Sequence, residues 1–225
     1  MKYTVIIPAA GLGSRMGLGF NKVLLEIDGE PVIKRTVRQF EEDPDCEAIH
    51  LAVRAEETDI MNKMFELSDK VAGIHIGGAE RQDSIYNALV NVKGAEYVFV
   101  HDGARPFVTP DVLARLKDKV TETGAVICGV KTKDTLKRVV DGKVKETLVR
   151  DEVIAVHTPQ GFESGILKQA YEHSKAHNLE VTDDSMMVEA IGKEVYLVES
   201  TYDNIKITTE EDLKVAESIM KKGSE

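Results

Sequence analysis

Short apolar runs alternate with amphipathic segments along the whole chain. Nearly continuous apolar runs predict strands at 3–7, 48–53, 71–76, 97–101, 125–130, 153–156 and 195–199. Helical spacing predicts helices at 32–41, 56–67, 84–92, 110–121, 164–175, 184–191 and 208–220. Strands without polar alternation are typical of sheets covered on both faces. The pattern predicts an α/β fold: a Rossmann-like, mainly parallel twisted sheet with helices on both faces.

One segment departs from this alternation. Residues 135–140 and 143–147 flank Asp141-Gly142, a strong signal for a β-hairpin between alternating runs. The segment is polar and basic, so it does not fit the interior of a sheet. It predicts a protruding arm at about 132–152, which either reaches a partner subunit or is a surface hairpin. Without repeats or a linker, residues 1–225 are expected to form one domain.

The charge balance limits the partners of the protein. A formal net charge of -10 over 225 residues disfavours nucleic acid and anionic membranes, so an anionic ligand needs a local basic cluster. No apolar run is long enough to span a bilayer, and no signal peptide is recognisable. The cysteines, Cys46 and Cys128, lack disulfide or zinc spacing and fit a reducing cytoplasm.

The first loop carries the clearest chemical signal. Residues 8–16, Pro-Ala-Ala-Gly-Leu-Gly-Ser-Arg-Met, follow the first strand, and Lys22 comes shortly afterwards. Small residues let backbone N–H groups approach an anion closely, and Arg15 and Lys22 add positive charge. Neither a Walker A pattern nor a complete dinucleotide fingerprint is present. A flexible loop would explain the glycines but not the two cations, so we predict a polyphosphate site.

Further unusual loops lie where strands end or helices begin, at 77–84, 101–106, 158–160, 182–184 and 204–206. Each alone could be a capped turn. Together they supply arginine, lysine and hydroxyl groups with one prominent acid, and no Ser-His-Asp pattern is present. His101 and His157 end apolar strands and are expected to be structural. The set favours phosphoryl or nucleotidyl transfer, in which the protein mainly positions groups and neutralises charge.

These motifs resemble a known family. The first loop with Lys22 looks like the signature of the sugar-phosphate nucleotidyltransferases. The later motifs, Gly-Gly-x-x-Arg-Gln-x-Ser, His-Asp-Gly-Ala-Arg-Pro, Thr-Pro-Gln-x-Phe, Thr-Asp-Asp and Asn-Ile-Lys-x-Thr, resemble the 2-C-methyl-D-erythritol 4-phosphate cytidylyltransferase family. The ribitol-5-phosphate cytidylyltransferases share most motifs, but their first loop usually reads Leu-Ala-Gly-Gly. Gly103 stands where many relatives carry alanine.

The resemblance implies transfer of CMP from CTP to methylerythritol phosphate, with Mg²⁺ as cofactor and pyrophosphate as leaving group. The implied catalytic residues are Arg15, Lys22, Arg150 and Lys206. The implied CTP-binding residues are Pro8, Ala9, Ala10, Gly11, Gly13, Gly78, Ser84 and Gly103. The implied substrate-binding residues are Asp102, Arg105, Thr135, Thr158 and Thr182.

Two further implications concern metal and assembly. Asp102 as a direct Mg²⁺ ligand is the less favoured role, with the metal held mainly by the CTP phosphates. The arm of one subunit is expected to cross to the other in a homodimer, bringing Thr135 and Arg150 to the neighbouring site. A non-catalytic nucleotide-binding module is a remote alternative, because such a module should have lost one of the cations, and all are present.

Overall fold

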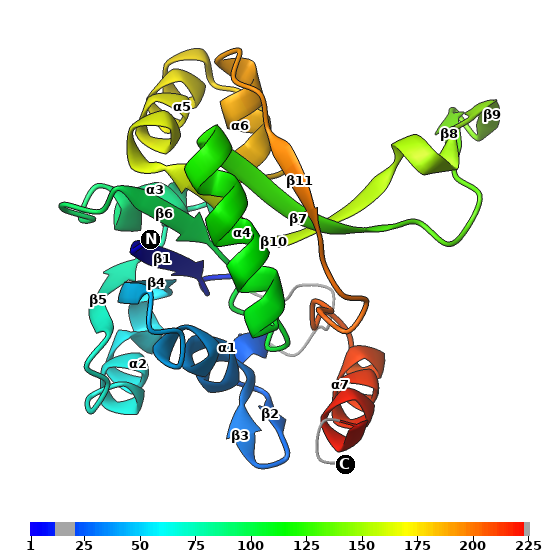
Figure 1. Cartoon of the computed structure of the whole chain (residues 1–225). Helices are drawn as coiled ribbons and strands as arrows, with labels where there is room; N and C mark the ends of the chain where they lie inside the picture. Colours follow the sequence, from blue (N-terminus) through cyan, green and yellow to red (C-terminus); the bar gives the residue numbers. More distant parts are fainter. Residues whose placement is uncertain (12–20, 223–225) are drawn as a thin grey trace.

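A seven-stranded sheet forms the centre of the computed structural model, which describes residues 1–11 and 21–222 (Figure 1). Its order is β11 (Tyr196–Glu199), β7 (Ala125–Lys131), β10 (Ile154–Glu163), β6 (Tyr97–Val100), β1 (Tyr3–Pro8), β4 (Cys46–Val53) and β5 (Val71–Ile76). All neighbours pair in parallel except β10, which is antiparallel to both β6 and β7. The predicted mainly parallel α/β sheet is confirmed.

Helices cover both faces of the sheet. On one face, α1 (Val32–Glu41), α2 (Thr58–Met64) and α4 (Pro110–Thr123) contribute to a core with β1 and β4. On the other, α3 (Arg81–Leu89), α5 (Ser164–His177) and α6 (Asp184–Ala190) pack in a second core. The continuous apolar strands supply alternate side chains to the two cores: Val5 and Ile7 to the first, Ile6 to the second. Burial on both faces explains the absence of polar alternation.

Two predicted boundaries are wrong in a way that matters for the site. Residues 158–160 are not a loop, because β10 continues through them to Glu163. Gln160 pairs with Val100 of β6, whereas the register with β7 shifts between His157 and Gly161. Helix α3 begins at Arg81, three residues earlier than predicted, because Glu80 and Asp83 form a reciprocal capping box at its start.

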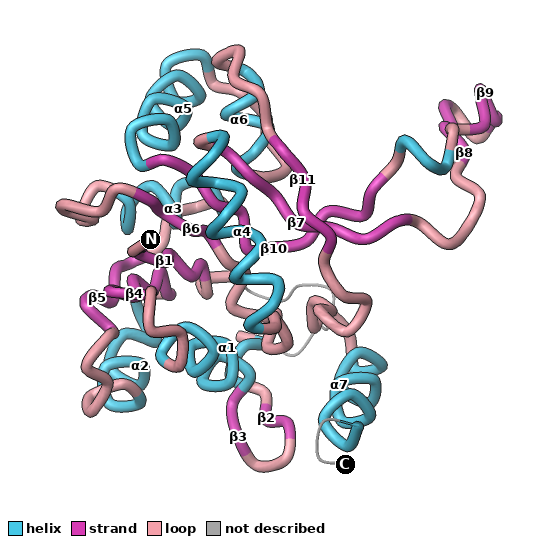
Figure 2. Tube along the Cα trace, in the orientation of Figure 1, coloured by secondary structure: helices cyan, strands magenta, loops and turns pink. Residues whose placement is uncertain are grey.

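Two Asp-Gly turns form hairpins. The predicted one joins β8 (Lys137–Val140) to β9 (Lys143–Thr147), with Asp141 and Gly142 both at positive φ. It lies at the tip of an arm that leaves the body through β7 and returns through η4 (Arg150–Glu152) and β10 (Figure 2). Asp28-Gly29 forms an unpredicted second hairpin between β2 (Glu26–Ile27) and β3 (Glu30–Pro31).

Two further 3₁₀ turns and a C-terminal helix complete the fold. The 3₁₀ turn η2 (Lys22–Leu24) follows the first loop, and η3 (Ala55–Glu57) follows β4. The last helix, α7 (Glu210–Lys222), packs Ala216 with Ile27 and Val32 in a small third core beside the β2–β3 hairpin. Within the described residues, no helix is both long and apolar enough to cross a membrane.

Candidate active site

A cavity of about 700 Å³ opens where β1, β4, β5 and β6 end. Because these strands are parallel, their carboxyl ends meet at one edge of the sheet. The cavity is lined by several of the predicted residues: Pro8, Ala9, Ala10, Gly11, Lys22, Gly78, Ser84, Asp102, Gly103 and Lys206. Other residues that line the cavity had no role predicted from their sequence motifs, among them Asn21, Arg54 and Arg81.

Close contacts of the backbone shape the part of this cavity around Ala9, Gly78 and Ser84. Ala9 N–H donates to the Ala52 carbonyl at 2.7 Å, so the chain after β1 stays attached to β4. A Cβ at Gly78 would lie 2.2 Å from the Cβ of Asp83, so only glycine fits there. Ser84 Oγ accepts the Gly78 N–H and donates to the Glu80 carbonyl, both at 3.0 Å. Ser84 thus holds the loop before α3 in shape.

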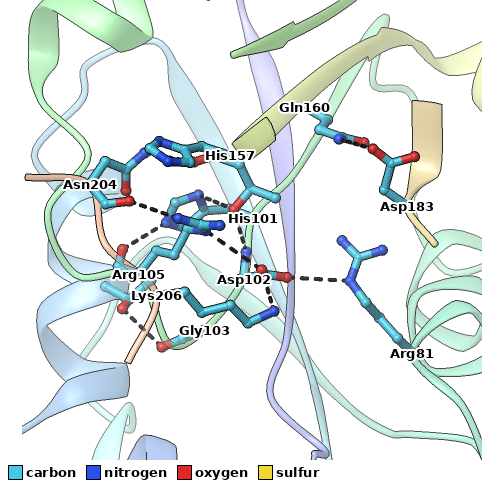
Figure 3. Close-up of polar contacts among 12 residues, drawn as sticks. Arg81, His101, Asp102, Gly103, Arg105, His157, Gln160, Asp183, Asn204 and Lys206 are labelled. Carbon is cyan, nitrogen blue, oxygen red and sulfur yellow. Dashed lines mark hydrogen bonds and ion pairs between the residues drawn. The ribbon is translucent and has the colours of Figure 1, made fainter. Parts of the chain in front are cut away.

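Asp102 lines the cavity and lies at the centre of a cluster of charged side chains (Figure 3). Its Oδ2 accepts a hydrogen bond from Lys206 Nζ at 2.7 Å and lies 3.7 Å from Arg105 Nε. Its Oδ1 accepts from Arg81 Nε at 3.3 Å. Lys206 follows β11, Arg81 begins α3 and Asp102 follows β6, so the fold gathers these groups from three separate segments.

The electrostatics of Asp102 follow from these neighbours. Burial raises the pKa of the Asp102 carboxyl, but the charges of Arg81 and Lys206 and the Lys206 hydrogen bond outweigh it. The pKa therefore lies below its usual range, and the carboxylate is ionised at neutral pH. Burial lowers the pKa of the Arg81 guanidinium, but the negative charges of Asp184 and Asp102 raise it by more than burial lowers it. The pKa therefore lies above its usual value, and the guanidinium stays charged.

A second carboxylate, Asp184, anchors Arg81 from behind. Asp184 is fully buried and accepts from Arg81 at 2.8 Å and from the hydroxyl of Tyr171. The cluster contains two carboxylates, Asp102 and Asp184, and three cations, Arg81, Arg105 and Lys206, so it carries one net positive charge at the edge of the cavity. Such a surplus favours an anionic ligand.

A neutral histidine supports the Asp102 loop from below. The Asp102 N–H donates to Thr158 Oγ1 at 2.9 Å, and Thr158 lies 3.1 Å from His101 Nδ1. His101 Nε2 lies 2.9 Å from the Arg105 carbonyl, which can only accept, so the proton is on Nε2 and Thr158 donates to Nδ1. Burial lowers the pKa of His101 to about 4 and keeps the ring neutral. The prediction of a structural His101 agrees with this geometry.

The other predicted site residues that the structure describes do not line the cavity. Arg105 and Thr158 are buried behind Asp102, and Arg105 donates to the Asn204 carbonyl at 2.7 Å. Thr182 lines a small recess that shares Arg81 with the cavity wall. Thr135 and Arg150 are exposed on the arm and do not line the cavity of their own chain. Gly13 and Arg15 lie outside the described residues.

Three functional candidates were missed, Asn21, Arg81 and Asp184. Arg81 stood in a recognised motif without an assigned role, and Asp184 was read only as part of a helix start. Arg81 contacts Asp184 across 103 residues of sequence, and Asn21 contacts Glu57 across 36. Motif spacing cannot reveal contacts of this kind.

The donor set does not favour a metal ion bound directly to protein. Both oxygens of Asp102 already accept from cationic side chains. Among residues 1–11 and 21–222, no three His, Cys, Asp or Glu side chains are grouped as metal ligands. Any Mg²⁺ would therefore rely on phosphate oxygens of the substrate.

The comparisons with known proteins agree with this geometry. The family model described as IspD, 2-C-methyl-D-erythritol 4-phosphate cytidylyltransferase, matches residues 3–222. The chain belongs to this family. A relative with the same enzyme name from Bacillus cereus is 48% identical over 223 residues, with 97% of this chain and 98% of the relative covered. A Shouchella clausii relative is 45% identical, with 99% and 98% covered.

Solved structures of family members share the fold. The 4-diphosphocytidyl-2C-methyl-D-erythritol synthase of Anaerococcus prevotii superposes with a TM-score of 0.88 at 30% identity, covering 98% of this chain and 96% of that one. The 2-C-methyl-D-erythritol 4-phosphate cytidylyltransferase of Francisella tularensis gives 0.83 at 32%, covering 96% and 98%. The predicted family, fold and enzyme class, CTP-dependent cytidylyl transfer, are confirmed.

Proposed function

We propose that the cavity catalyses transfer of CMP from CTP to 2-C-methyl-D-erythritol 4-phosphate by positioning the substrates and neutralising their charge. A phosphate oxygen of the substrate attacks the α-phosphorus of CTP, a new P–O bond forms, and the bond to pyrophosphate breaks. A phosphate monoester is already an anionic nucleophile at neutral pH, so no general base is required. The observation that carries the proposal is that Lys22 and Lys206 line one cavity with the backbone at Pro8–Gly11.

In this proposal the cations act on the reacting phosphates. Lys22 neutralises the triphosphate and stabilises the pentavalent transition state, and Arg15 of the first loop assists it. Lys206 exchanges its contact with Asp102 for the α-phosphate and the incoming phosphate. Its side chain is 35% exposed and its partner Asp102 has two other cationic neighbours, which supports such an exchange.

The nucleotide and the polyol occupy different walls. The backbone of Pro8–Gly11, with Gly13, Gly78, Ser84 and Gly103, holds the cytosine and ribose, and the small residues around Gly78 support a narrow pocket. Asp102 orients the polyol hydroxyls, Arg105 acts from behind through its contact with Asp102, and Thr182 lies at the adjoining recess. Thr158 acts one step removed, because its hydroxyl is engaged with the Asp102 loop.

Mg²⁺ enters as part of the nucleotide substrate. The ion would supply Lewis-acid neutralisation of the triphosphate, while Lys22 and Lys206 would supply the protein's share of positive charge. The cationic neighbours of Asp102, which are Arg81, Arg105 and Lys206, disfavour a further positive charge there and support this arrangement over a direct ligand role.

The arm is proposed to complete the site of a second subunit in a homodimer. Four valines of the arm, Val139, Val140, Val144 and Val149, are each at least 40% exposed, more than an isolated hairpin should leave uncovered. Thr135 and Arg150 would then meet the substrate phosphate of the neighbour.

Both cysteines are free and buried, in keeping with a reducing cytoplasm.

Pyrophosphate release tests the proposed reaction. Purified protein with CTP and Mg²⁺ is offered methylerythritol 4-phosphate or ribitol 5-phosphate, and ATP and GTP replace CTP in parallel. We expect the highest kcat/KM for CTP with methylerythritol phosphate. A higher value for ribitol phosphate would refute the acceptor, and equal use of a purine nucleotide would refute the donor specificity.

A further inference from the structure

Glu57 is a buried carboxylate that no step of the proposed reaction uses. It ends η3, its side chain is 9% exposed, and it does not line the cavity although Glu56, Ala55 and Arg54 do. A negative charge beside a triphosphate pocket opposes ligand binding, so its presence calls for a compensating role. Its contacts are Asn21 Nδ2 at 2.8 Å and Arg54 at 3.9 Å.

Asn21 connects Glu57 to the first loop. Asn21 is fully buried, and its amide nitrogen donates both to Glu57 Oε2 and to the Ala9 carbonyl. Its Oδ1 accepts the Val23 N–H at 3.3 Å and so caps η2. An ionised carboxylate can only accept, so Glu57 fixes which way the Asn21 amide faces. A reversed amide would lose all three contacts.

The Asn21 contacts fix the distance between the end of β1 and the start of η2. Ala9 is tied to the sheet through Ala52, and Asn21 holds the start of η2 against Ala9 across 12 residues of sequence. Lys22 is the first residue of η2 and lines the cavity. We infer that Glu57 and Asn21 are positioning residues that set the place of Lys22 beside the nucleotide phosphates. The inference rests on the proposed role of Lys22.

Kinetics of Glu57 variants test the inference. A misplacement of about 1 Å can cost about 10²-fold in rate. We therefore expect Glu57→Ala to lower kcat by about 10- to 100-fold, with a smaller change in the KM for CTP. Glu57→Gln keeps an acceptor oxygen for Asn21 and should recover most of kcat. Asp59→Ala is the matched control, because Asp59 is an exposed carboxylate on α2 outside the cavity.

A double-mutant cycle separates positioning from general loosening. If Glu57 acts through Lys22, Glu57→Ala should cost little further kcat in the Lys22→Ala background. Full additivity, or wild-type kcat for Glu57→Ala alone, would overturn the inference. Wild-type kcat for Lys22→Ala would instead refute the proposed role of Lys22 itself.

A second variant serves if Glu57→Ala does not fold, as judged by circular dichroism. Asn21→Ser can still cap η2 but offers one donor where asparagine offers two. The same loss of kcat and the same non-additivity with Lys22→Ala are expected. Unchanged or additive kinetics for this variant would overturn the inference as well.

Discussion

Lys206 Nζ lies 2.7 Å from Asp102 Oδ2, although 104 residues separate them in the sequence. The contact holds Lys206 at the cavity wall, where its side chain stays partly exposed and can contact a ligand. When a phosphate group attracts Lys206, Asp102 remains paired with Arg81 and close to Arg105. In the proposed mechanism, the same carboxylate holds Lys206 before the phosphate binds and orients the polyol afterwards.

Lys206→Ala should leave a folded protein with a kcat lowered by about 10²- to 10³-fold, the usual cost of removing one preorganised charge-stabilising donor. Pyrophosphate release measures the rate. Lys214→Ala is the control, since Lys214 is an exposed lysine on α7. A Lys206→Ala enzyme as fast as the control would remove Lys206 from the reaction.

Asp102→Asn should destabilise the protein by about 3 kcal/mol near neutral pH, because the buried Arg105 and the partly exposed Arg81 and Lys206 lose their counter-charge. The folded pKa of Asp102 is lowered, so its stabilising contribution is full above the unfolded value of about 4 and is lost as pH falls toward the folded value. Urea unfolding at several pH values measures this. The gap between wild type and variant should be constant from pH 5 to 8 and narrow only below about pH 4; a gap that closes at pH 6 would contradict the assignment.

His101 should make the wild-type protein less stable as pH falls from about 6.5 to about 4. The folded pKa is about 4, whereas the unfolded chain takes up the proton near pH 6.5, so acid favours the unfolded state. His101→Gln removes this group and should be less stable than wild type at pH 7.5, with a difference that shrinks toward pH 4.5. A difference independent of pH would show that His101 is not buried in its neutral form.

Mixing two inactive variants tests the shared site. If Arg150 serves the partner subunit, exchange between Lys22→Ala and Arg150→Ala proteins restores one intact site in each mixed dimer. Random exchange should then recover about a quarter of wild-type activity. Mass spectrometry of differently labelled subunits confirms exchange. Activity that stays at background with exchange complete would place Arg150 in its own chain's site, or outside the reaction.

The sequence predicted the parts of this molecule that depend on local pattern. Continuous apolar runs located the strands, and Asp141-Gly142 located the arm, because turn chemistry and periodicity are properties of neighbouring residues. The same turn signal at Asp28-Gly29 was available and overlooked. Lys22, Asp102 and Lys206 were selected from short motifs, and the fold brings all three to one cavity.

Buried polar contacts between distant segments were not predictable. Glu57 follows Glu56 in an acidic stretch that reads as the solvent face of a helix, yet one is buried and the other exposed. In the sequence, Arg81 and Asp184 are likewise ordinary residues at the start of a helix. The fold brings the start of α3 next to the start of α6, and the two side chains form an ion pair there. Residues 158–160 read as a loop because Pro159 cannot donate to a strand, although β6 receives Gln160 as a strand partner.

The place of β10 has a consequence for how the chain is made. It lies between β6 and β7 but follows both in sequence. A nascent chain that has emerged only through the arm therefore leaves β6 with one unpaired edge and β7 without either of its neighbours. Unpaired strand edges are the surfaces on which unfinished proteins aggregate. The arm thus separates β7 from the strand that closes the sheet, and synthesis must pass residue 163 before the two halves can join. A ribosome-held chain that stops before Ile154 should depend on chaperones, whereas one that extends through β11 has all seven strands of the sheet and should depend on them less.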